Sequence, residues 1–220
     1  MNRRHLLASA IAATLLAMLA APTAWAAQGE PPAAQPSAAP PLDVQALLYD
    51  PKTPTGGNPK GDVTIVAFFD YNCGYCKQSS PALEKLVKED GKIRLVYKDW
   101  PILAASSVSA AQLALAAHYQ GKYQAAHKAL IALPSRSMND AKMSAALKAA
   151  GVDLARLSAD LDANAKEIGA ILVRNNEQAE ALQLPGTPVY LVGPYKVAAS
   201  LDYQGFKDVV ADARKRASEN

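Results

Sequence analysis

Apolar residues follow two different spacings along the chain, and their order predicts a mixed α/β fold. Residues 63–69 (VTIVAFF) are continuously apolar and rich in residues that favour strands, as expected for a strand buried on both faces. Apolar and polar positions alternate in residues 92–100 (KIRLVYKDW), which indicates a second strand. Between these runs, residues 73–89 place their apolar positions on one helical face. This β-α-β unit predicts two parallel strands joined by a right-handed crossover.

The second half of the chain completes the pattern. Residues 104–184 have helical periodicity throughout. Strand signals return at residues 189–192 and 196–199, which a Gly-Pro pair separates, and they predict a hairpin. Apolar positions at helical spacing over residues 206–213 predict a closing helix. The sequence therefore predicts a small mixed sheet, built from a β-α-β half and a β-β-α half, with a helical insertion between them.

The first residues have the pattern of a signal peptide. Arg3 and Arg4 precede an apolar run over residues 6–21, and Ala-Trp-Ala at 24–26 is a small-residue cleavage site. We expect residues 1–26 to be removed on export to the periplasm. An uncleaved membrane anchor is the alternative, although the apolar run is short for a transmembrane helix of about 20 residues.

Composition divides the rest of the chain. Residues 27–60 begin with a Pro- and Ala-rich stretch without periodicity, so we expect a flexible N-terminal segment, with ordered structure beginning near Asp62. Within this segment we expect a short helix at residues 42–48. We assign the two halves of the sheet, residues 61–103 and 185–217, to one domain. Residues 104–184 then form an inserted helical domain.

The charge balance argues against nucleic acid as a partner. The 220 residues carry a formal net charge of +3, from 23 basic and 20 acidic side chains. Loss of Arg3 and Arg4 with the leader would lower this charge to +1. Proteins that bind nucleic acid usually carry a strongly basic surface, which this composition does not supply.

The only two cysteines lie in the run FFDYNCGYCKQSSP, residues 68–81. They enclose a very small loop, so a disulfide between them would constrain the unfolded chain little. Cys73 follows the buried strand and begins the helix, where free backbone N–H groups and the helix dipole favour a thiolate. We expect Cys73 to be a nucleophile with a lowered pKa, and Cys76, one turn later, to be a more buried resolving thiol. Gly74 and Tyr75 would leave room for a substrate and offer it an aromatic face.

A zinc site and a purely structural disulfide are the alternatives for this pair. Structural zinc needs four ligands, and beyond the leader the chain offers only His118 and His127 as histidines. Nine residues apart on a helix, these two side chains would not share a face. We therefore expect both histidines to be packing or surface residues and no metal site within the chain, while a metal shared with a partner stays open. The strand-to-helix position of the pair favours exchange over a structural disulfide.

A second motif, Pro185-Gly186-Thr187-Pro188, lies directly before the predicted hairpin. Proline can occupy the first position of a strand but not its middle. By itself this motif indicates an ordinary turn, because most X-Pro bonds are trans.

Taken together, these motifs resemble the DsbA family of thioredoxin-fold thiol-disulfide oxidoreductases. The resemblance rests on the CxxC motif at the first strand-helix junction, Pro81 five residues later, the helical insertion, and Gly-Thr-Pro before the hairpin. The runs FFDYNCGYCK and YKDWPIL are most similar to the ScsC/Com1-like branch of the family. The resemblance covers roughly residues 60–217.

The resemblance implies a fold, a chemistry and a binding site. The fold would be a thioredoxin fold with a central helical insertion, and the Thr187–Pro188 peptide bond would be cis and lie beside the disulfide. Cys73 would exchange with substrate sulfur through a mixed disulfide that Cys76 resolves, without any cofactor besides this redox-active disulfide. An extended substrate would pair with the backbone of Thr187 as an added strand. The substrate-binding residues would be Gly74, Tyr75, Thr187 and Pro188.

The same resemblance implies partners but leaves the direction of exchange open. Clients would be exported proteins with thiols or disulfides, and a membrane protein of the DsbB type or of the DsbD/ScsB type would reset the site. Relatives commonly carry glutamate where this chain has Ala67, and Gly74-Tyr75 and Thr187 resemble the isomerase DsbC. A monomer is expected, because the Pro-rich segment cannot form a helical trimerising stalk. We expect a dithiol oxidase; an isomerase or reductase and a Cu(I)-binding copper-tolerance protein are the alternatives.

Overall fold

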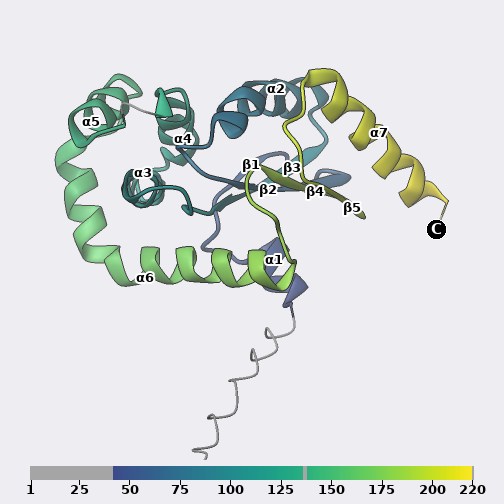
Figure 1. Cartoon of the computed structure of the whole chain (residues 1–220), viewed down its shortest axis with the longest axis horizontal. Coiled ribbons are helices and arrows are strands. Elements are labelled where there is room, and N and C mark those ends of the chain that lie inside the picture. Colours follow the sequence, from purple (N-terminus) through teal and green to yellow (C-terminus); the bar gives the residue numbers. More distant parts are fainter. Residues whose placement is uncertain (1–41, 136–137, 220) are drawn as a thin grey trace, which may run out of the picture. The chain divides into compact units, whose positions relative to one another are not determined.

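The computed structural model describes residues 42–135 and 138–219 (Figure 1). The predicted signal peptide and the Pro- and Ala-rich stretch up to residue 41 lie outside the described residues. Within the described part, no helix is both long enough and apolar enough to cross a membrane.

A mixed five-stranded sheet forms the centre of the structure, in the order β1-β3-β2-β4-β5. Strands β2 and β3 are parallel, and β1, β4 and β5 each run antiparallel to the strand they join. The strands are β1 (Thr55–Gly57), β2 (Val63–Phe69), β3 (Ile93–Asp99), β4 (Val189–Val192) and β5 (Tyr195–Val197). The helices are α1 (Val44–Tyr49), α2 (Gly74–Asp90), α3 (Ala105–His118), α4 (Tyr123–Ile131), α5 (Asp140–Ala149), α6 (Leu154–Ala181) and α7 (Tyr203–Ser218).

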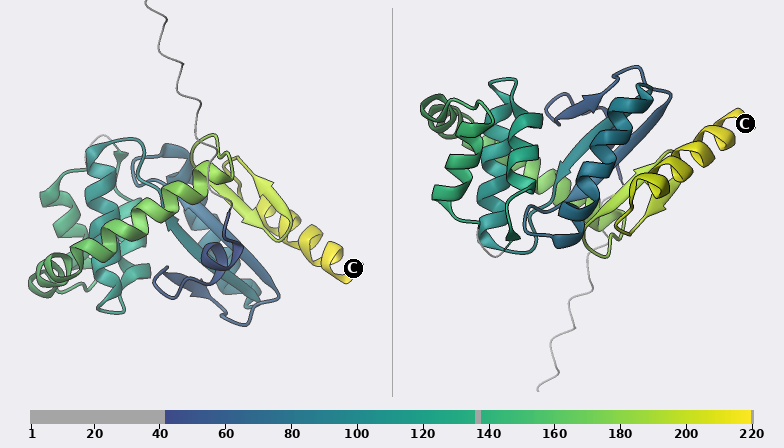
Figure 2. Two further views of the ribbon diagram at one scale, coloured as in Figure 1. Left: turned by 90° about the horizontal axis from the view of Figure 1, so that it is seen from below. Right: turned by 90° about the horizontal axis from the view of Figure 1, so that it is seen from above.

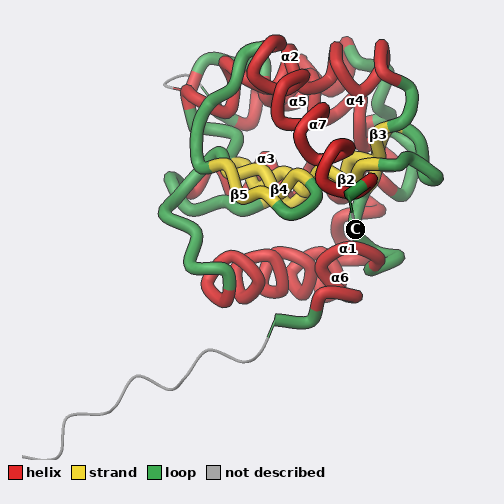
Figure 3. The backbone as a smooth tube through the Cα atoms, turned by 90° about the vertical axis from the view of Figure 1, so that its right-hand side faces the viewer, coloured by secondary structure: helices red, strands yellow, loops and turns green. Residues whose placement is uncertain are grey.

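Helices cover both faces of the sheet, as Figures 1 and 3 show. Side chains of β2 alternate between the faces, so its continuous apolar run supplies two cores at once. Ile65, Ala67 and Phe69 belong to the core that α2, α7 and the helical insertion share. Val66 and Phe68 belong to a second core with residues of α1 and α6 on the opposite face. Burial on both faces explains why this strand has no polar side.

The helical insertion is joined to the sheet by a continuous core. Helix α3 packs on both α4 and α6, and α4 packs on α5. Leu115, Leu130 and Met143 are fully buried there and belong to the same cluster as the β2 residues. Figure 2 shows α6 running from the far end of the insertion back to the strands. The insertion therefore supports one side of the sheet instead of projecting from it.

The predicted fold class is confirmed, and one element was missed. Both strands of the β-α-β unit, the helix between them and the closing helix occur where the sequence predicts them. The hairpin is also present, with its second strand at 195–197 instead of 196–199. The sequence assigns residues 42–60 to a flexible segment with a short helix at 42–48. Helix α1 lies there as expected, whereas strand β1 was not foreseen, and this is the correction. Strand β1 (TGG) has no apolar residue to signal it, and it forms because β3 offers an edge for pairing with Thr55, Gly56 and Gly57.

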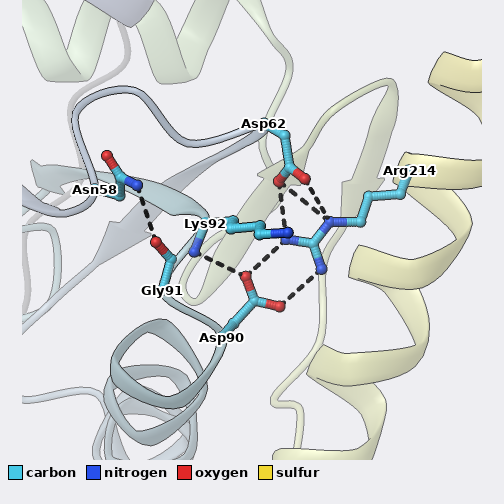
Figure 4. Close-up of polar contacts among 6 residues, drawn as sticks. All are labelled: Asn58, Asp62, Asp90, Gly91, Lys92 and Arg214. Atoms are coloured by element: carbon cyan, nitrogen blue, oxygen red, sulfur yellow. Dashed lines mark hydrogen bonds and ion pairs between the residues drawn. The ribbon is translucent and has the colours of Figure 1, made fainter.

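A charged clamp ties the C-terminal helix to the β-α-β unit (Figure 4). The Arg214 guanidinium of α7 donates to both carboxylate oxygens of Asp62 at 2.8–3.1 Å and to both of Asp90 at 2.7 Å. Asp62 precedes β2, and Asp90 ends α2. Gly91, at φ +68°, ends this helix in the left-handed conformation and accepts a hydrogen bond from Asn58. Bidentate pairs of this kind are among the stronger charge-assisted hydrogen bonds.

Replacing Arg214 with glutamine should lower the free energy of unfolding at pH 7 by about 1–2 kcal/mol. The hydrogen bonds from Arg214 hold the pKa of Asp90 below its usual value. A lowered folded-state pKa gives a stabilisation that is present above about pH 4 and is lost as the pH falls through the folded value. Urea unfolding curves at pH 7, 4 and 2.5 should therefore show a difference between wild type and variant that shrinks at the lowest pH.

Lys215→Gln is the matched control, because it removes the same charge from the neighbouring exposed position. Its unfolding curve should stay within about 0.5 kcal/mol of wild type at every pH. A difference for Arg214→Gln that stays constant down to pH 2.5 would show that the clamp does not act through the ionised carboxylate of Asp90.

Candidate active site

Cys73 occupies the N-cap of α2, directly after the strand β2 and its short connection. Its backbone is extended, at φ −71° and ψ 115°, and its Sγ accepts a hydrogen bond from the Cys76 N–H at 3.3 Å. The first N–H groups of a helix lack partners within the helix, so a sulfur at this position lies where negative charge is stabilised. The structure thus places Cys73 at the helix start that the sequence predicts for it.

Cys76 lies one turn further along α2 and faces the core. It is 2% exposed and Cys73 is 5% exposed, and both are free thiols in the structure. Behind Cys76, the Ser79 hydroxyl and the Tyr190 hydroxyl are 2.5 Å apart and hydrogen-bonded. No sequence signal distinguishes these two residues, because a serine on a helix and a tyrosine in a strand are ordinary there.

The two thiols have opposite electrostatic environments. A hydrogen bond from the Cys76 thiol, supported by the Thr187 side chain and the N–H groups of Cys76 and Tyr75, outweighs burial and lowers the pKa of Cys73 to about 6. Burial, followed by the hydrogen bond to Cys73, raises the pKa of Cys76. At neutral pH Cys73 is therefore largely a thiolate, the form that attacks disulfides, whereas Cys76 keeps its proton.

The Gly-Thr-Pro motif lies against the cysteine pair, although 114 residues separate Thr187 from Cys73. In its protonated form, the Cys73 thiol donates to the backbone carbonyl oxygen of Thr187, with Sγ and O 3.2 Å apart. The Thr187–Pro188 peptide bond is cis. An added Cβ at Gly74 would meet no atom within 4 Å, so the space outside this glycine is open.

An open groove of about 800 Å³ begins beside the cysteine pair. Tyr75, which is 68% exposed, lines it together with Thr187 and Pro188. The groove continues along residues 198–203, between β5 and α7. Both polar and apolar residues line it, as suits an extended peptide better than a purely apolar ligand.

Asp70 organises the approach to the site, and the sequence did not single it out. This carboxyl group is 1% exposed and accepts hydrogen bonds from the N–H groups of Asn72, Ile102 and Leu103 and from the Ser107 hydroxyl, all at 2.6–2.9 Å. It therefore joins the turn before Cys73 to the loop before α3. Its position directly after the apolar run of β2, at the carboxyl end of the strand, is the signal that could have identified it.

A buried polar cluster lies next to the site, beneath the turn that carries Cys73. The Tyr71 hydroxyl is 3.1 Å from His127 Nδ1, and the Tyr123 hydroxyl donates to Asp99 at 2.7 Å. Burial lowers the pKa of His127 to about 3 and raises the pKa of Asp99 to about 7. His127 is thus a neutral packing residue at physiological pH, and His118 lies exposed at the end of α3.

Metal binding has no support from clustered ligands in the described residues. No group of three or more histidine, cysteine, aspartate or glutamate side chains is close enough to hold an ion there. The His127 imidazole makes contacts with Tyr71 and Ser80 through its two nitrogens, and these contacts occupy both potential ligand atoms.

The site and the sheet define a thiol-disulfide exchange protein, and comparison with known proteins places it in a family. The family described as Thioredoxin matches residues 50–212. The chain belongs to this thioredoxin family and is a thiol-disulfide oxidoreductase with the DsbA-like form of the fold, in which a helical insertion interrupts the sheet.

Three solved structures show this likeness. A thioredoxin-like oxidoreductase from Silicibacter pomeroyi DSS-3 is 38% identical, with a TM-score of 0.72, and the match covers 79% of this chain and 99% of that one. The thiol-disulfide exchange protein alpha-DsbA2 from Wolbachia pipientis is 27% identical, with a TM-score of 0.72 and coverage of 76% and 90%. The catalytic domain of Proteus mirabilis ScsC is 25% identical, with a TM-score of 0.69 and coverage of 77% and 93%.

A curated relative has a different description and a much longer chain. The Na(+)/H(+) antiporter NhaA 3 of Salinispora tropica is 28% identical over 166 residues, which are 72% of this chain and 25% of the antiporter. This chain therefore spans about a quarter of the length of the antiporter, and antiport activity is a property of that protein.

Proposed function

We propose that this protein is an exported dithiol oxidase of the periplasm, which transfers its Cys73–Cys76 disulfide to other exported proteins. The observation that carries the proposal is the contrast between the two thiols, a Cys73 pKa lowered to about 6 beside a buried Cys76 whose pKa is raised. A stabilised Cys73 thiolate favours the reduced form of the site, so the disulfide is readily given away. Cys73 is also the better leaving group when a mixed disulfide is broken.

The proposed exchange balances in two steps. A client thiolate attacks the Cys73 sulfur, forming a mixed disulfide and releasing Cys76 as a thiolate that takes up a proton. A second client thiolate then attacks its own sulfur in the mixed disulfide and releases the Cys73 thiolate. The client dithiol has been oxidised to a disulfide and the protein disulfide reduced to a dithiol, with two electrons transferred.

Substrate contacts are assigned to the residues that border the groove. Gly74 and Tyr75 would contact the client beside the cysteines, and the backbone of Thr187, followed by Pro188, would pair with an extended client segment. The groove of about 800 Å³ has room for such a segment. The partners would be exported client proteins and a DsbB-like membrane protein that restores the disulfide, and the protein would act as a monomer. A structure described as a periplasmic thioredoxin-like protein, from Salmonella enterica serovar Typhimurium, supports this location by likeness.

Equilibration with glutathione and a pair of client assays tests the direction of exchange. The reduction potential should lie above about −180 mV, on the oxidising side of protein disulfide isomerase. The oxidised protein should introduce a disulfide into a reduced, unfolded client with two cysteines, as alkylation and mass measurement would show. It should reshuffle a client with scrambled disulfides poorly.

Other results would support the other roles. A potential near −270 mV with rapid reshuffling would support an isomerase or reductase that a DsbD-like partner keeps reduced. Stoichiometric, tight Cu(I) binding by the reduced protein, without measurable exchange with glutathione, would support a copper-binding protein in which Cys73 and Cys76 are the ligands.

A further inference from the structure

A narrow cavity lies against Cys76 and shares no lining residue with the groove. Its volume of about 20 Å³ is enough for one water molecule. The small side chain of Ala67 on β2 forms part of the wall, together with Phe69 and Leu83. Ala67 contributes no side-chain atom beyond its Cβ to this wall, so it leaves open space that a longer side chain pointing the same way would occupy.

One row of side chains on α2 runs along this cavity. Cys76, Ser80 and Glu84 are spaced four residues apart, which places them above one another on one helix face. Eight residues of helix span about 12 Å, so the Glu84 carboxyl cannot touch the Cys76 thiol directly. The Ser80 hydroxyl, which also lies 3.5 Å from His127 Nε2, can bridge this distance together with one water in the cavity.

Glu84 also connects the cavity to the surface. It is half-buried, and it lines two larger outer hollows of about 420 Å³ each. Lys88 and Lys128, both exposed, line these outer hollows too. A proton that reaches Glu84 from the inside can therefore pass to solvent on the outside.

The exchange reaction needs such a path. When Cys76 resolves a mixed disulfide its thiol must lose a proton, and burial makes the thiolate unfavourable there. We propose that Glu84 accepts this proton from Cys76 through Ser80 and one water molecule, and returns it when the disulfide is reduced. The inference rests on exchange at Cys73 and Cys76, and it holds for either direction of exchange.

Oxidation of the protein by glutathione disulfide takes two steps. The Cys73 thiolate attacks one glutathione sulfur, forming a mixed disulfide and releasing one glutathione thiolate. The Cys76 sulfur then attacks Cys73, its proton passes to the Glu84 carboxylate, and the second glutathione leaves as a thiolate. One disulfide forms and one is broken in each step, and two electrons pass to glutathione.

The other ionisable groups among the described residues of the cavity wall are poorly suited to this role. Burial raises the pKa of Tyr97 and of Tyr190, so neither phenol is ionised at neutral pH to accept a proton. Burial lowers the pKa of His127 to about 3, so a proton on its imidazole would be costly. Burial raises the pKa of Glu84, and the positive charge of Lys128 opposes this shift. The ionisable groups that line the same hollows as Glu84 include Lys128 and His127 from α4, Tyr97 from β3 and Lys88 from its own helix.

Rapid mixing of the reduced protein with excess glutathione disulfide, followed by acid quenching and mass spectrometry, separates the two steps. In Glu84→Gln the rate constant for loss of the mixed disulfide at pH 7 should fall about tenfold or more. This rate constant should then rise with pH across the range from 6 to 8, because hydroxide has to remove the proton, whereas the wild-type profile should level off. Ser80→Ala, which should leave the helix intact, should slow the same step.

Glu89→Gln is the matched control, an exposed acid five residues further along the same helix. It should resolve the mixed disulfide at the wild-type rate. In all three variants, alkylation of Cys73 by iodoacetamide should keep its midpoint near pH 6, since this thiol does not use the path. A wild-type rate and pH profile in Glu84→Gln would overturn the inference, and so would an equal loss in the first step, which would indicate a general structural effect.

The outcome of this experiment does not depend on the proposed direction of exchange. Reaction with glutathione disulfide measures resolution by Cys76 whether the protein acts on its clients as an oxidase or as an isomerase. A reducing potential would contradict the oxidase proposal and leave the effect of Glu84→Gln unchanged.

Discussion

Serine in place of Cys73 should abolish thiol-disulfide exchange, with a fall of at least about 10³-fold in both client oxidation and insulin reduction. A hydroxyl at the N-cap can still accept the Cys76 N–H, so α2 keeps its start and the fold should persist. What is lost is the thiolate, the only group at the helix start that can attack or be attacked by sulfur. Client oxidation is measured by the gain of disulfide in a reduced two-cysteine client.

Cys76→Ser gives the complementary result. Its Cys73 thiolate should still react, and the mixed disulfide with a client should accumulate because no second thiol resolves it. Non-reducing gels would show this covalent complex, and it should be absent for Cys73→Ser. Equal exchange by Cys73→Ser and wild type would contradict the assignment of the nucleophile.

Alanine in place of Asp70 should cost about 3–5 kcal/mol in the free energy of unfolding. The substitution removes the acceptor of four hydrogen bonds and leaves the N–H groups of Asn72, Ile102 and Leu103 without it in a partly buried place. The melting temperature should fall by about 10 °C for a chain of this length. Thermal unfolding followed by circular dichroism measures both quantities.

The client-oxidation activity of Asp70→Ala should distinguish a role in positioning the site from a purely structural role. Asp70 fixes the turn that presents Cys73 and the loop that presents Ile102 and Leu103, so client oxidation at a temperature where Asp70→Ala is still folded should fall as well. Asp208→Ala, at an exposed position of α7, is the control and should leave stability and oxidation near wild type. A variant at Asp70 that melts within about 2 °C of wild type would show that the loop finds other partners.

The strands and helices that carry the site could be predicted because their own residues specify them. Strand β2 is apolar on both faces, and this is visible in seven consecutive residues. The helix start at Cys73 follows from the end of that strand and from the apolar face of α2. The position of Thr187 and Pro188 beside the cysteines was predicted only from the family resemblance, because a turn before a strand does not by itself indicate which distant residue it meets.

The elements that the sequence did not reveal depend on distant partners. Strand β1 contains two glycines and forms only against the edge of β3. Asp70 is one polar residue at a strand end, and its importance comes from N–H groups more than thirty residues away. Glu84 has the sequence context of an ordinary surface glutamate on a helix, and only the cavity left by Ala67 distinguishes it from its neighbours.

The buried pair of Asp99 and His127 has a consequence for the whole molecule's response to acid. The folded chain keeps His127 neutral down to about pH 3, so the stability this residue contributes is lost as the pH falls below about 6.5. The folded chain keeps Asp99 protonated up to about pH 7, so the stability this residue contributes is lost as the pH rises above about 4. Between pH 4 and 6.5 the two slopes are opposite, each of about 1.4 kcal/mol per pH unit. Folding therefore neither takes up nor releases a net proton through this pair. The contribution of the pair to stability stays nearly constant in mild acid, where either residue alone would make stability depend on pH.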